Sequence, residues 1–462
     1  MSLRNITYMA GSNQFTGKLG FILVSAAAAI GLANIWRFPY LAAQYGGGTF
    51  VLIYLIFVVT LGFTLITAEI AIGRKTGKSP LKAFQSLCGK HPLFTKIAGI
   101  LPVIISLLTV SYYAIITGWL LKYCLSYLTN SGELLAADNG AFFSAYIGGS
   151  IEPIIWTLVV FVISAAVLCF GVQKGLQRVC IVLVPALIVC MAGLAVYVLT
   201  LPGGIDGLLY CLVPDFSKFS LDAVIAAMGQ TFFSLSIGAG IYITYGMYLS
   251  KKENIEKSVH SIEIFDTGAA LLAMILIVPM VFAFSGGNPE ALGSGSALLF
   301  EQIPQVLTTL PNGGMVIGSI FFLVVFAAAL TSVFSLIEVP VSAISLHFSI
   351  SRKKTLALIC SIAAILSVLV NFGYSIWKDV TFFGKPILDA LDSLVSNALM
   401  PVAVILCCIL VGWMIDTKEI TDEIENDGQR FRWKKFFVIM IKYIAPVCIL
   451  IIMISNIIAQ FV

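Results

Sequence analysis

The sequence predicts an all-α polytopic membrane protein with eleven transmembrane helices. Of its 462 residues, 59% are hydrophobic and only 11% are charged, and the mean hydropathy is +1.02. A soluble domain carries about 25% charged residues, and less than half that share cannot cover a globule of this length in water. Composition therefore argues against a soluble enzyme, a nucleic-acid-binding protein and a disordered scaffold, and it leaves the lipid bilayer as the main solvent.

Apolar stretches give the number of spans. A spanning helix needs about 20 mostly apolar residues, and the first stretch is too long for a cleavable signal peptide. We predict one membrane domain, 1–462, in which the charged connection 416–435 is a solvated cytoplasmic hairpin. The predicted spans are 16–41, 50–73, 98–128, 151–171, 176–200, 221–248, 261–285, 313–346, 355–372, 387–413 and 437–460.

Basic residues give the orientation. With the N-terminus in the cytoplasm, 22 of the 27 Lys and Arg residues fall in cytoplasmic segments and four fall outside, while Arg37 lies within a span. This bias predicts a cytoplasmic N-terminus and, after eleven crossings, an extracellular or periplasmic C-terminus. The ten scattered cysteines contain no CxxC pair, so neither a zinc site nor a disulfide framework is predicted.

Two spans contain glycine among small or polar residues. They read SAAAAIGLANIWRFPY (25–40) and GQTFFSLSIGAGIYITYG (229–246), and they lie five spans apart. Because five is odd, a second copy of a five-span unit enters the membrane inverted, which predicts a 5+5 inverted repeat with broken helices 1 and 6. Its halves are about 16–200 and 221–413, with an extra helix at 437–460. Such breaks free carbonyls for cations and amides for a carboxylate at the membrane midplane, although glycines can also serve only close helix packing.

Charged residues inside the predicted spans each need a reason, because each costs about 2.5–3.5 kcal/mol on insertion scales. Structural alternatives exist for several: Arg37 can snorkel to the outer interface, Glu69 can tie helix ends together, and Asp266 can reach cytoplasmic water. The candidates are Arg37, Glu69, Asp266, Glu338, Asp389 and Asp392.

Four segments resemble the neurotransmitter:sodium symporter family: GLANIWRFPYLAAQYGGGTF (31–50), AEIAIGR (68–74), GQTFFSLSIGAG (229–240) and ALTS (329–332). The similarity covers the whole chain, and eleven spans are typical of bacterial members. The resemblance implies a 5+5 inverted-repeat fold that carries amino acids or amines with sodium by alternating access. It further implies a monomer in the cell inner membrane whose partners are an amino-acid substrate, sodium and the lipid bilayer, with no nucleic acid.

The resemblance also implies two Na⁺ sites. The first would combine a carbonyl and an Asn of span 1, a hydroxyl of span 6, a polar side chain of span 7 and the substrate carboxylate; by position these are Ala29, Asn34, Ser234 and Asp266. The second would use carbonyls beside the span-1 break and two hydroxyls of span 8: Ala27, Ile30, Ala328, Thr331 and Ser332. A dehydrated hard cation favours about six oxygen ligands. Ser and Thr in a span otherwise bond back to their own helix.

A substrate pocket carries over by position as well. In it, Tyr113 would donate its hydroxyl to the substrate carboxylate. Amine-specific members place Asp where this chain has Gly31, so the substrate must bring its own carboxylate, which favours α-amino acids. Ala239 stands where a leucine-selective member has a bulky aromatic, which favours a large hydrophobic or aromatic side chain. The implied lining is Ala29, Leu32, Ala33, Thr109, Tyr113, Phe233, Ser234, Ser236, Ala239, Ser332 and Leu336.

Gates follow from the same resemblance. Arg37 and Asp392 match the extracellular ion pair, with Phe233 and Tyr113 beneath it. The family's cytoplasmic Arg–acid pair falls near Ser12 and at Leu346-His347, so both of its members are absent and the inner closure must differ.

Asp266 has three possible roles: it ligates the first sodium, it replaces chloride, or it only caps the start of span 7. The first two roles predict transport that is independent of chloride.

Three other classes of protein are weighed against a sodium symporter. A proton-coupled or exchanging carrier on the same fold would need a protonatable group, for which Asp266 or Glu69 could serve, but both hydroxyls and Asn34 are retained. A receptor or sensor would be expected to add a cytoplasmic domain, and none is apparent. An enzyme is the weakest option, because no Ser/His/Asp set or metal cluster is visible and the three His lie at cytoplasmic ends.

Overall fold

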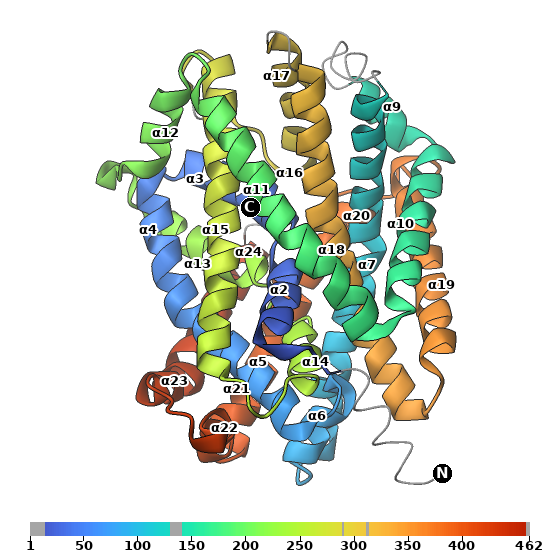
Figure 1. The fold of residues 1–462 in the computed structure, drawn as a ribbon, viewed down its shortest axis with the longest axis vertical. Coiled ribbons are helices and arrows are strands. Elements are labelled where there is room, and N and C mark those ends of the chain that lie inside the picture. Colours follow the sequence, from blue (N-terminus) through green and yellow to red (C-terminus); the bar gives the residue numbers. More distant parts are fainter. Residues whose placement is uncertain (1–13, 130–140, 289–290, 311–313, 459–462) are drawn as a thin grey trace.

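The computed structural model describes residues 14–129, 141–288, 291–310 and 314–458, and within these ranges the chain is predominantly helical (Figure 1). Two isolated bridges, Gly47–Pro214 and Phe382–Lys385, are the strand-like pairings of the described residues. The all-α class predicted from composition and apolar run length is therefore confirmed.

Eight continuous helical stretches of the described chain are long and apolar enough to cross a membrane. Two bent helix pairs of the described chain bring this number to ten, and the predicted span 221–248 is divided into two helices. The eight are Gly48–Thr76 (α4, Gly48–Phe57, and α5, Phe63–Thr76), Pro92–Leu128 (α7), Val172–Leu199 (with α11, Gln177–Leu199), Ile255–Phe284 (α15), Gly314–Phe348 (α18), Arg352–Tyr374 (with α19, Arg352–Asn371), Ile387–Met414 (α20, Ile387–Leu394, and α21, Met400–Ile409) and Lys434–Ile458 (α23, Lys434–Ile439, and α24, Ala445–Ile458). The two bent pairs are α2 (Gly17–Ala29) with α3 (Phe38–Gln44), and the short α9 (Ala141–Gly148) with α10 (Glu152–Leu168). The divided span consists of α13 (Leu221–Ser234) and α14 (Ile241–Met247).

Short helices connect the spans at both ends of the bundle. At the end where α5 and α14 terminate lie α6 (Pro80–Leu87) and α22 (Thr417–Ile424), and at the opposite end lie α12 (Gly204–Leu212), α16 (Gly295–Ala297) and α17 (Ile303–Thr309) (Figure 1). These connections are too short to form a separate domain.

The break in span 1 begins where α2 stops at Ala29 and Ile30 turns extended, with φ −67° and ψ 106°. The chain bends by 57° before the helix resumes at Ala33. The side chain of Asn34 replaces a lost helix bond, because its Oδ1 accepts the Gly31 N–H at 2.9 Å.

The break in span 6 has a different local cause. Ser236, Gly238 and Gly240 have φ of 50°, 89° and 74°, a left-handed region in which an α-helix cannot continue and which glycine tolerates best. The two interruptions predicted from sequence are therefore present at the predicted positions.

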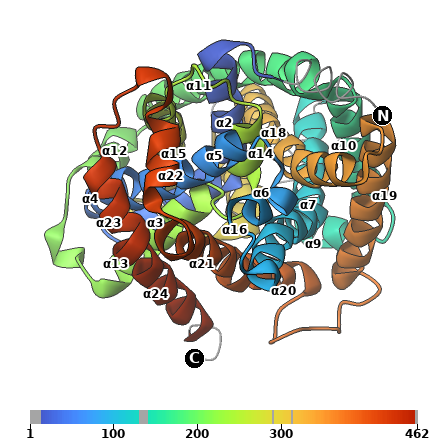
Figure 2. The ribbon, with the colours of Figure 1, turned by 90° about the horizontal axis from the view of Figure 1, so that it is seen from below.

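Helices α2, α5, α14 and α18 lie inside the bundle, with α4, α10, α12 and α19 nearer its rim (Figure 2). Burial agrees: 78% of the most apolar window of α18 is buried, against 33% for the stretch that contains α11. On α11 the exposed Val182, Val189 and Val196 recur every seven residues, which is the pattern of a face that meets lipid. Both interrupted spans thus meet in the protein interior, away from lipid.

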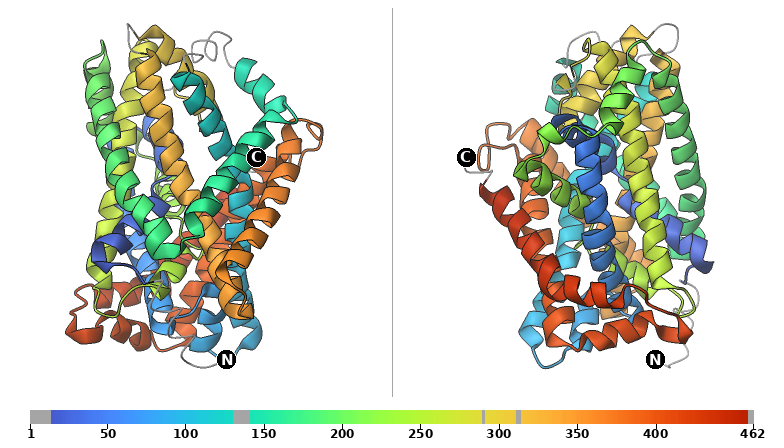
Figure 3. Two further views of the ribbon diagram at one scale, coloured as in Figure 1. Left: turned by 45° about the vertical axis from the view of Figure 1, so that its right-hand side comes forward. Right: turned by 90° about the vertical axis from the view of Figure 1, so that its left-hand side faces the viewer.

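The prediction of a solvated hairpin over 416–435 is wrong. Helix α22 lies across the lower end of the bundle (Figure 3) and buries Ile420 and Ile424, which are 0% and 2% exposed. Its Glu423 binds Arg74 at the end of α5, with 2.8 Å between Oε1 and Nε, and also binds Lys251 at 2.8 Å. The charge run suggested solvation, but an apolar stripe and complementary cations on the neighbouring helices dock the segment instead.

Candidate functional site

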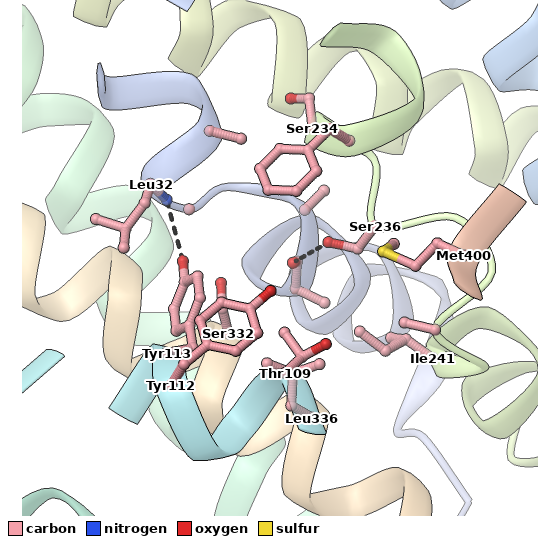
Figure 4. A pocket seen from close by; sticks show the side chains of 16 residues that line it. Leu32, Thr109, Tyr112, Tyr113, Ser234, Ser236, Ile241, Ser332, Leu336 and Met400 are labelled. Atoms are coloured by element: carbon pink, nitrogen blue, oxygen red, sulfur yellow. Dashed lines mark hydrogen bonds between the residues drawn. The ribbon is translucent and has the colours of Figure 1, made fainter. Parts of the chain in front are cut away.

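A cavity of about 60 Å³ lies between the two breaks, enclosed by side chains from spans 1, 3, 6, 8 and 10 (Figure 4). All eleven residues that the sequence predicts as pocket lining do line it: Ala29, Leu32, Ala33, Thr109, Tyr113, Phe233, Ser234, Ser236, Ala239, Ser332 and Leu336. Five further residues complete the wall: Ala28, Gly31, Tyr112, Ile241 and Met400.

One end of the cavity is polar. The Tyr113 hydroxyl accepts the N–H of Leu32 at 3.0 Å, so it sits directly on the backbone amides that the span-1 break frees. A Cβ added at Gly31 would lie 2.7 Å from this hydroxyl and 3.0 Å from the Ser332 hydroxyl. Position 31 therefore has no room for a carboxylate side chain in this arrangement, and the hydroxyl together with the freed amides suits a carboxylate that the ligand brings.

The other end of the cavity is apolar. Ile241, Leu336 and Met400 lie away from Tyr113 (Figure 4). Thr109 donates its hydroxyl hydrogen to the Ile105 carbonyl of its own helix, at 2.8 Å. The small Ala239 lies on the unwound span-6 segment, and its carbonyl accepts a hydrogen bond from Ser106 at 2.6 Å. The cavity thus suits a ligand with one carboxylate end and one hydrophobic end.

A buried polar cluster adjoins the cavity where spans 1, 6 and 7 meet. Asn34 Nδ2 donates to Ser234 Oγ at 3.0 Å and to Asp266 Oδ1 at 2.8 Å, and the Ser234 hydroxyl lies 3.1 Å from both Asp266 oxygens. Tyr54 donates to Asp266 Oδ2 at 3.2 Å. All three predicted side chains of the first sodium site meet here, and the fourth predicted member, Ala29, lines the adjoining cavity.

The structure also bears on the alternatives for Asp266. Helix α15 begins at Ile255 and is capped by Asn254, whose side chain accepts the Lys257 N–H at 2.8 Å. Asp266 lies three turns further along the helix and is 0% exposed. The interpretations that it caps the span or reaches cytoplasmic water are therefore wrong.

A second cluster of oxygens lies between spans 1 and 8. The Thr331 hydroxyl is 3.1 Å from the Ala27 carbonyl, and the Ser332 hydroxyl is 3.4 Å from the Ile30 carbonyl. Both hydroxyls also bond back to Ala328 O of their own helix, at 2.9 and 3.3 Å. The back-bonding alternative and the cross-helix arrangement thus coexist, and all five predicted groups of the second sodium site converge: Ala27, Ile30, Ala328, Thr331 and Ser332.

Above the cavity, Arg37 lies over the ring of Phe233, with 5.0 Å from Cζ to the ring centroid. Asp392 lies beside the Tyr112 hydroxyl and within electrostatic reach of Arg37, but these two described charges form no ion pair within 4.0 Å. The two residues of the predicted outer pair therefore lie near each other, but they are not in contact in this conformation.

Near the inner end lies an ion pair that the sequence motifs did not indicate. Arg352 binds Glu338 through two bonds of 2.5 and 2.8 Å and donates to the Leu168 carbonyl at 3.3 Å. Tyr248 donates to the same carboxylate at 3.2 Å. Ser12 lies outside the described residues. This network joins α18, α19 and the end of span 6, in the part of the molecule where the sequence offered no Arg–acid pair.

An aromatic cluster lies beside this network. The ring of Phe15 contacts Phe21, Tyr245 and Tyr248, with centroid distances of 5.4, 5.9 and 6.3 Å. Phe15 itself is 7% exposed. Tyr248 belongs to both groups, so the rings pack directly against the ion-pair network.

Glu69 accepts the Gly238 N–H at 2.9 Å and so holds the unwound segment of span 6. A structural role that ties helix ends together was the alternative for Glu69. The backbone that Glu69 holds belongs to the break in span 6. Asp389 contacts Tyr374 near the outer end of span 10, at 3.5 Å.

Sequence reasoning missed Tyr54, Tyr112, Ile241, Arg352 and Met400. Tyr54 sits in the apolar run VLIYLIF, where nothing distinguishes it from packing. Tyr112 precedes Tyr113 in SYYAIITGW, and the doubled aromatic was a usable signal. Arg352 lies in the basic segment 352–354, just before the predicted span 355–372, where basic residues are common in any case.

Comparisons with known proteins agree with this geometry. The profile described as "Sodium:neurotransmitter symporter family" matches residues 12–136 and 147–461. The chain is 34% identical to the "Uncharacterized sodium-dependent transporter YhdH" of Bacillus subtilis (strain 168) over 96% of this chain and 97% of that protein. It is 26% identical to the sodium- and chloride-dependent GABA transporter 2 of Rattus norvegicus, over 89% of this chain and 75% of that one.

A solved structure is similar over nearly the whole length. The crystal structure of MhsT in complex with L-phenylalanine superposes with a TM-score of 0.85 at 33% identity, covering 96% of this chain and 99% of that one. With this match the predicted fold, a 5+5 inverted repeat with broken helices 1 and 6, is confirmed.

Proposed function

Because the chain belongs to the sodium:neurotransmitter symporter family, we propose that it carries a hydrophobic or aromatic α-amino acid into the cell together with sodium, by alternating access and without chloride. It is a sodium-dependent, multi-pass membrane transporter and not an enzyme. The observation that carries the finer proposal is the meeting of Asn34, Ser234 and Asp266 beside a cavity with one polar and one apolar end.

The substrate class follows from the two ends of the cavity. Tyr113 and the amides at the span-1 break bind the carboxylate, and the apolar end receives the side chain. Position 31 has no room for an acidic side chain, which leaves the substrate carboxylate as the group that completes the first cation site. MhsT, which matches at 33% identity, was crystallised with L-phenylalanine, and this supports an aromatic amino acid here.

Two sodium ions accompany the substrate. One binds at Ala29, Asn34, Ser234 and Asp266, and the other binds among the three carbonyls and two hydroxyls between spans 1 and 8. Each set consists of oxygen atoms, the ligands that hard cations prefer. Asp266 supplies a fixed negative charge at the first site, so no anion is needed to offset the cation there.

Access alternates between two closures. Arg37 and Asp392 approach over Phe233 and Tyr113 when substrate is bound, and the Arg352–Glu338 pair separates when the inner side opens. The working unit is a monomer with a single domain, 1–462, in the bacterial inner membrane, with its N-terminus cytoplasmic and its C-terminus outside. Its repeats are about 16–200 and 221–413.

Counterflow in liposomes tests the proposal. Purified protein reconstituted with an unlabelled hydrophobic amino acid inside should exchange it for labelled amino acid outside only when sodium is present. Exchange that is equally fast when choline replaces sodium would contradict sodium coupling. Binding of amino acids without any exchange would indicate a receptor instead.

A further inference from the structure

One wall of the cavity comes from span 10, which none of the sequence motifs placed there. Met400 is the first residue of α21 and is 5% exposed. Its side chain projects toward the unwound span-6 segment that carries Ser236 (Figure 4). Met400 therefore lies at the apolar end, opposite Tyr113.

The backbone at Met400 is locally irregular. A π-helical turn, Val395–Leu399, directly precedes it, and Pro401 follows within the first turn of α21. A π-turn inserts one extra residue and shifts the side chains that follow it, and proline lacks the N–H that an ordinary helix would use. Span 10 is thus reshaped where it passes the cavity.

The same stretch is packed tightly against the break in span 6. A Cβ added at Gly238 would lie 2.9 Å from the Met400 carbonyl and 2.8 Å from Val404 Cγ2. The backbone of Met400 is thus held against the span-6 break, and its side chain is the part with rotational freedom to adjust to a ligand.

Methionine suits that task, since it is unbranched, has several rotatable bonds and contacts both aliphatic and aromatic groups favourably. Among the other residues of the lining, Ile241 is β-branched and stiffer at χ1, Leu336 has fewer rotatable bonds than methionine, and Ala239 has no rotatable side chain. We propose that Met400 is the specificity-determining residue that sets how large a substrate side chain the pocket admits. The inference rests on the proposed function, because it names the residue that sets the substrate preference of that transport.

The test is the ranking of ligands by purified protein, measured as competition of tryptophan and leucine against a labelled amino acid. Met400→Ala should raise the preference for tryptophan over leucine by about tenfold or more, the discrimination that a mismatch of one methylene gives in an apolar pocket. Met400→Phe should shift the preference as far toward leucine. A ratio within one variant does not depend on expression level.

Met440→Ala is the matched control, because Met440 is 4% exposed in a π-turn of span 11 and does not line the cavity. It should keep the wild-type ratio. Ratios within twofold of wild type in both Met400 variants, or a shift as large in Met440→Ala, would overturn the inference. A wild type that binds neither ligand would overturn the proposed function and this inference together, whereas ordinary binding with unchanged ranking overturns the inference alone.

Discussion

Thr331 and Ser335 are one helical turn apart on α18, yet of the two only Thr331 reaches a carbonyl of span 1. Its hydroxyl lies 3.1 Å from Ala27 O, whereas Ser335 bonds back to Thr331 O at 3.0 Å. Thr331→Ala should raise the sodium concentration for half-maximal uptake about tenfold, or about 1.4 kcal/mol, because a dehydrated ion loses a ligand. Ser335→Ala should change that concentration less than twofold. Equal effects of the two variants would contradict the second sodium site.

Asp266 carries the prediction about chloride. Its carboxylate is fully buried among Asn34, Ser234 and Tyr54. Replacing chloride with gluconate at constant sodium should therefore leave wild-type uptake unchanged. Asp266→Ser removes the fixed charge and should either create a chloride requirement or abolish uptake. A large loss of wild-type uptake in gluconate would refute the assigned role.

At the scale of elements, the pair of Arg352 and Glu338 joins the start of α19 to α18. The Glu338 side chain is 0% exposed, so Arg352→Gln leaves a buried charge unpaired and should lower the free energy of unfolding by about 3–5 kcal/mol. The double variant Glu338→Gln with Arg352→Gln should recover most of that loss. Thermal unfolding in detergent measures both, and a double variant as unstable as the single one would show that the charges are not coupled.

Helix α22 gives a second element-scale prediction. Glu423 is 8% exposed and contacts Arg74 and Lys251, whereas Glu419 on the same helix is 49% exposed and pairs with Lys75 at 3.3 Å. Glu423→Gln should destabilise the protein by about 3 kcal/mol, and Glu419→Gln by less than about 1 kcal/mol. Thermal unfolding in detergent measures both variants. Equal and small losses of stability in the two would show that α22 is only loosely attached.

The elements that the sequence predicted well are those with strong apolar or glycine signals. All eleven spans and both breaks could be predicted, because run length, Gly31 and the SIGAG segment reflect local chemistry. The docking of α22 could not, because its partners Arg74 and Lys251 lie more than 170 residues away in the chain. The eleven predicted pocket residues converge on one cavity. Met400, which also lines it, and Tyr54, which bonds Asp266 in the adjoining polar cluster, lie in spans whose sequences look like ordinary packing.

For the whole molecule, the proposed stoichiometry of two sodium ions predicts how far substrate can be concentrated. Two ions that move down 100 mV supply about 2.3 kcal/mol each, and a tenfold sodium gradient adds about 1.4 kcal/mol per ion. The total of about 7.4 kcal/mol supports accumulation of a zwitterion by about 10⁵-fold at most. One ion would support only about 500-fold, so the limiting gradient distinguishes the two stoichiometries.

Uptake into proteoliposomes with either sodium or protons as the imposed driving ion tests the central claim most directly. Labelled phenylalanine should accumulate when sodium is high outside and the interior is negative. It should not accumulate when choline replaces sodium and a proton gradient of the same size is imposed. Accumulation that persists without sodium and follows the proton gradient would contradict sodium-coupled transport and would favour the proton-coupled carrier on the same fold.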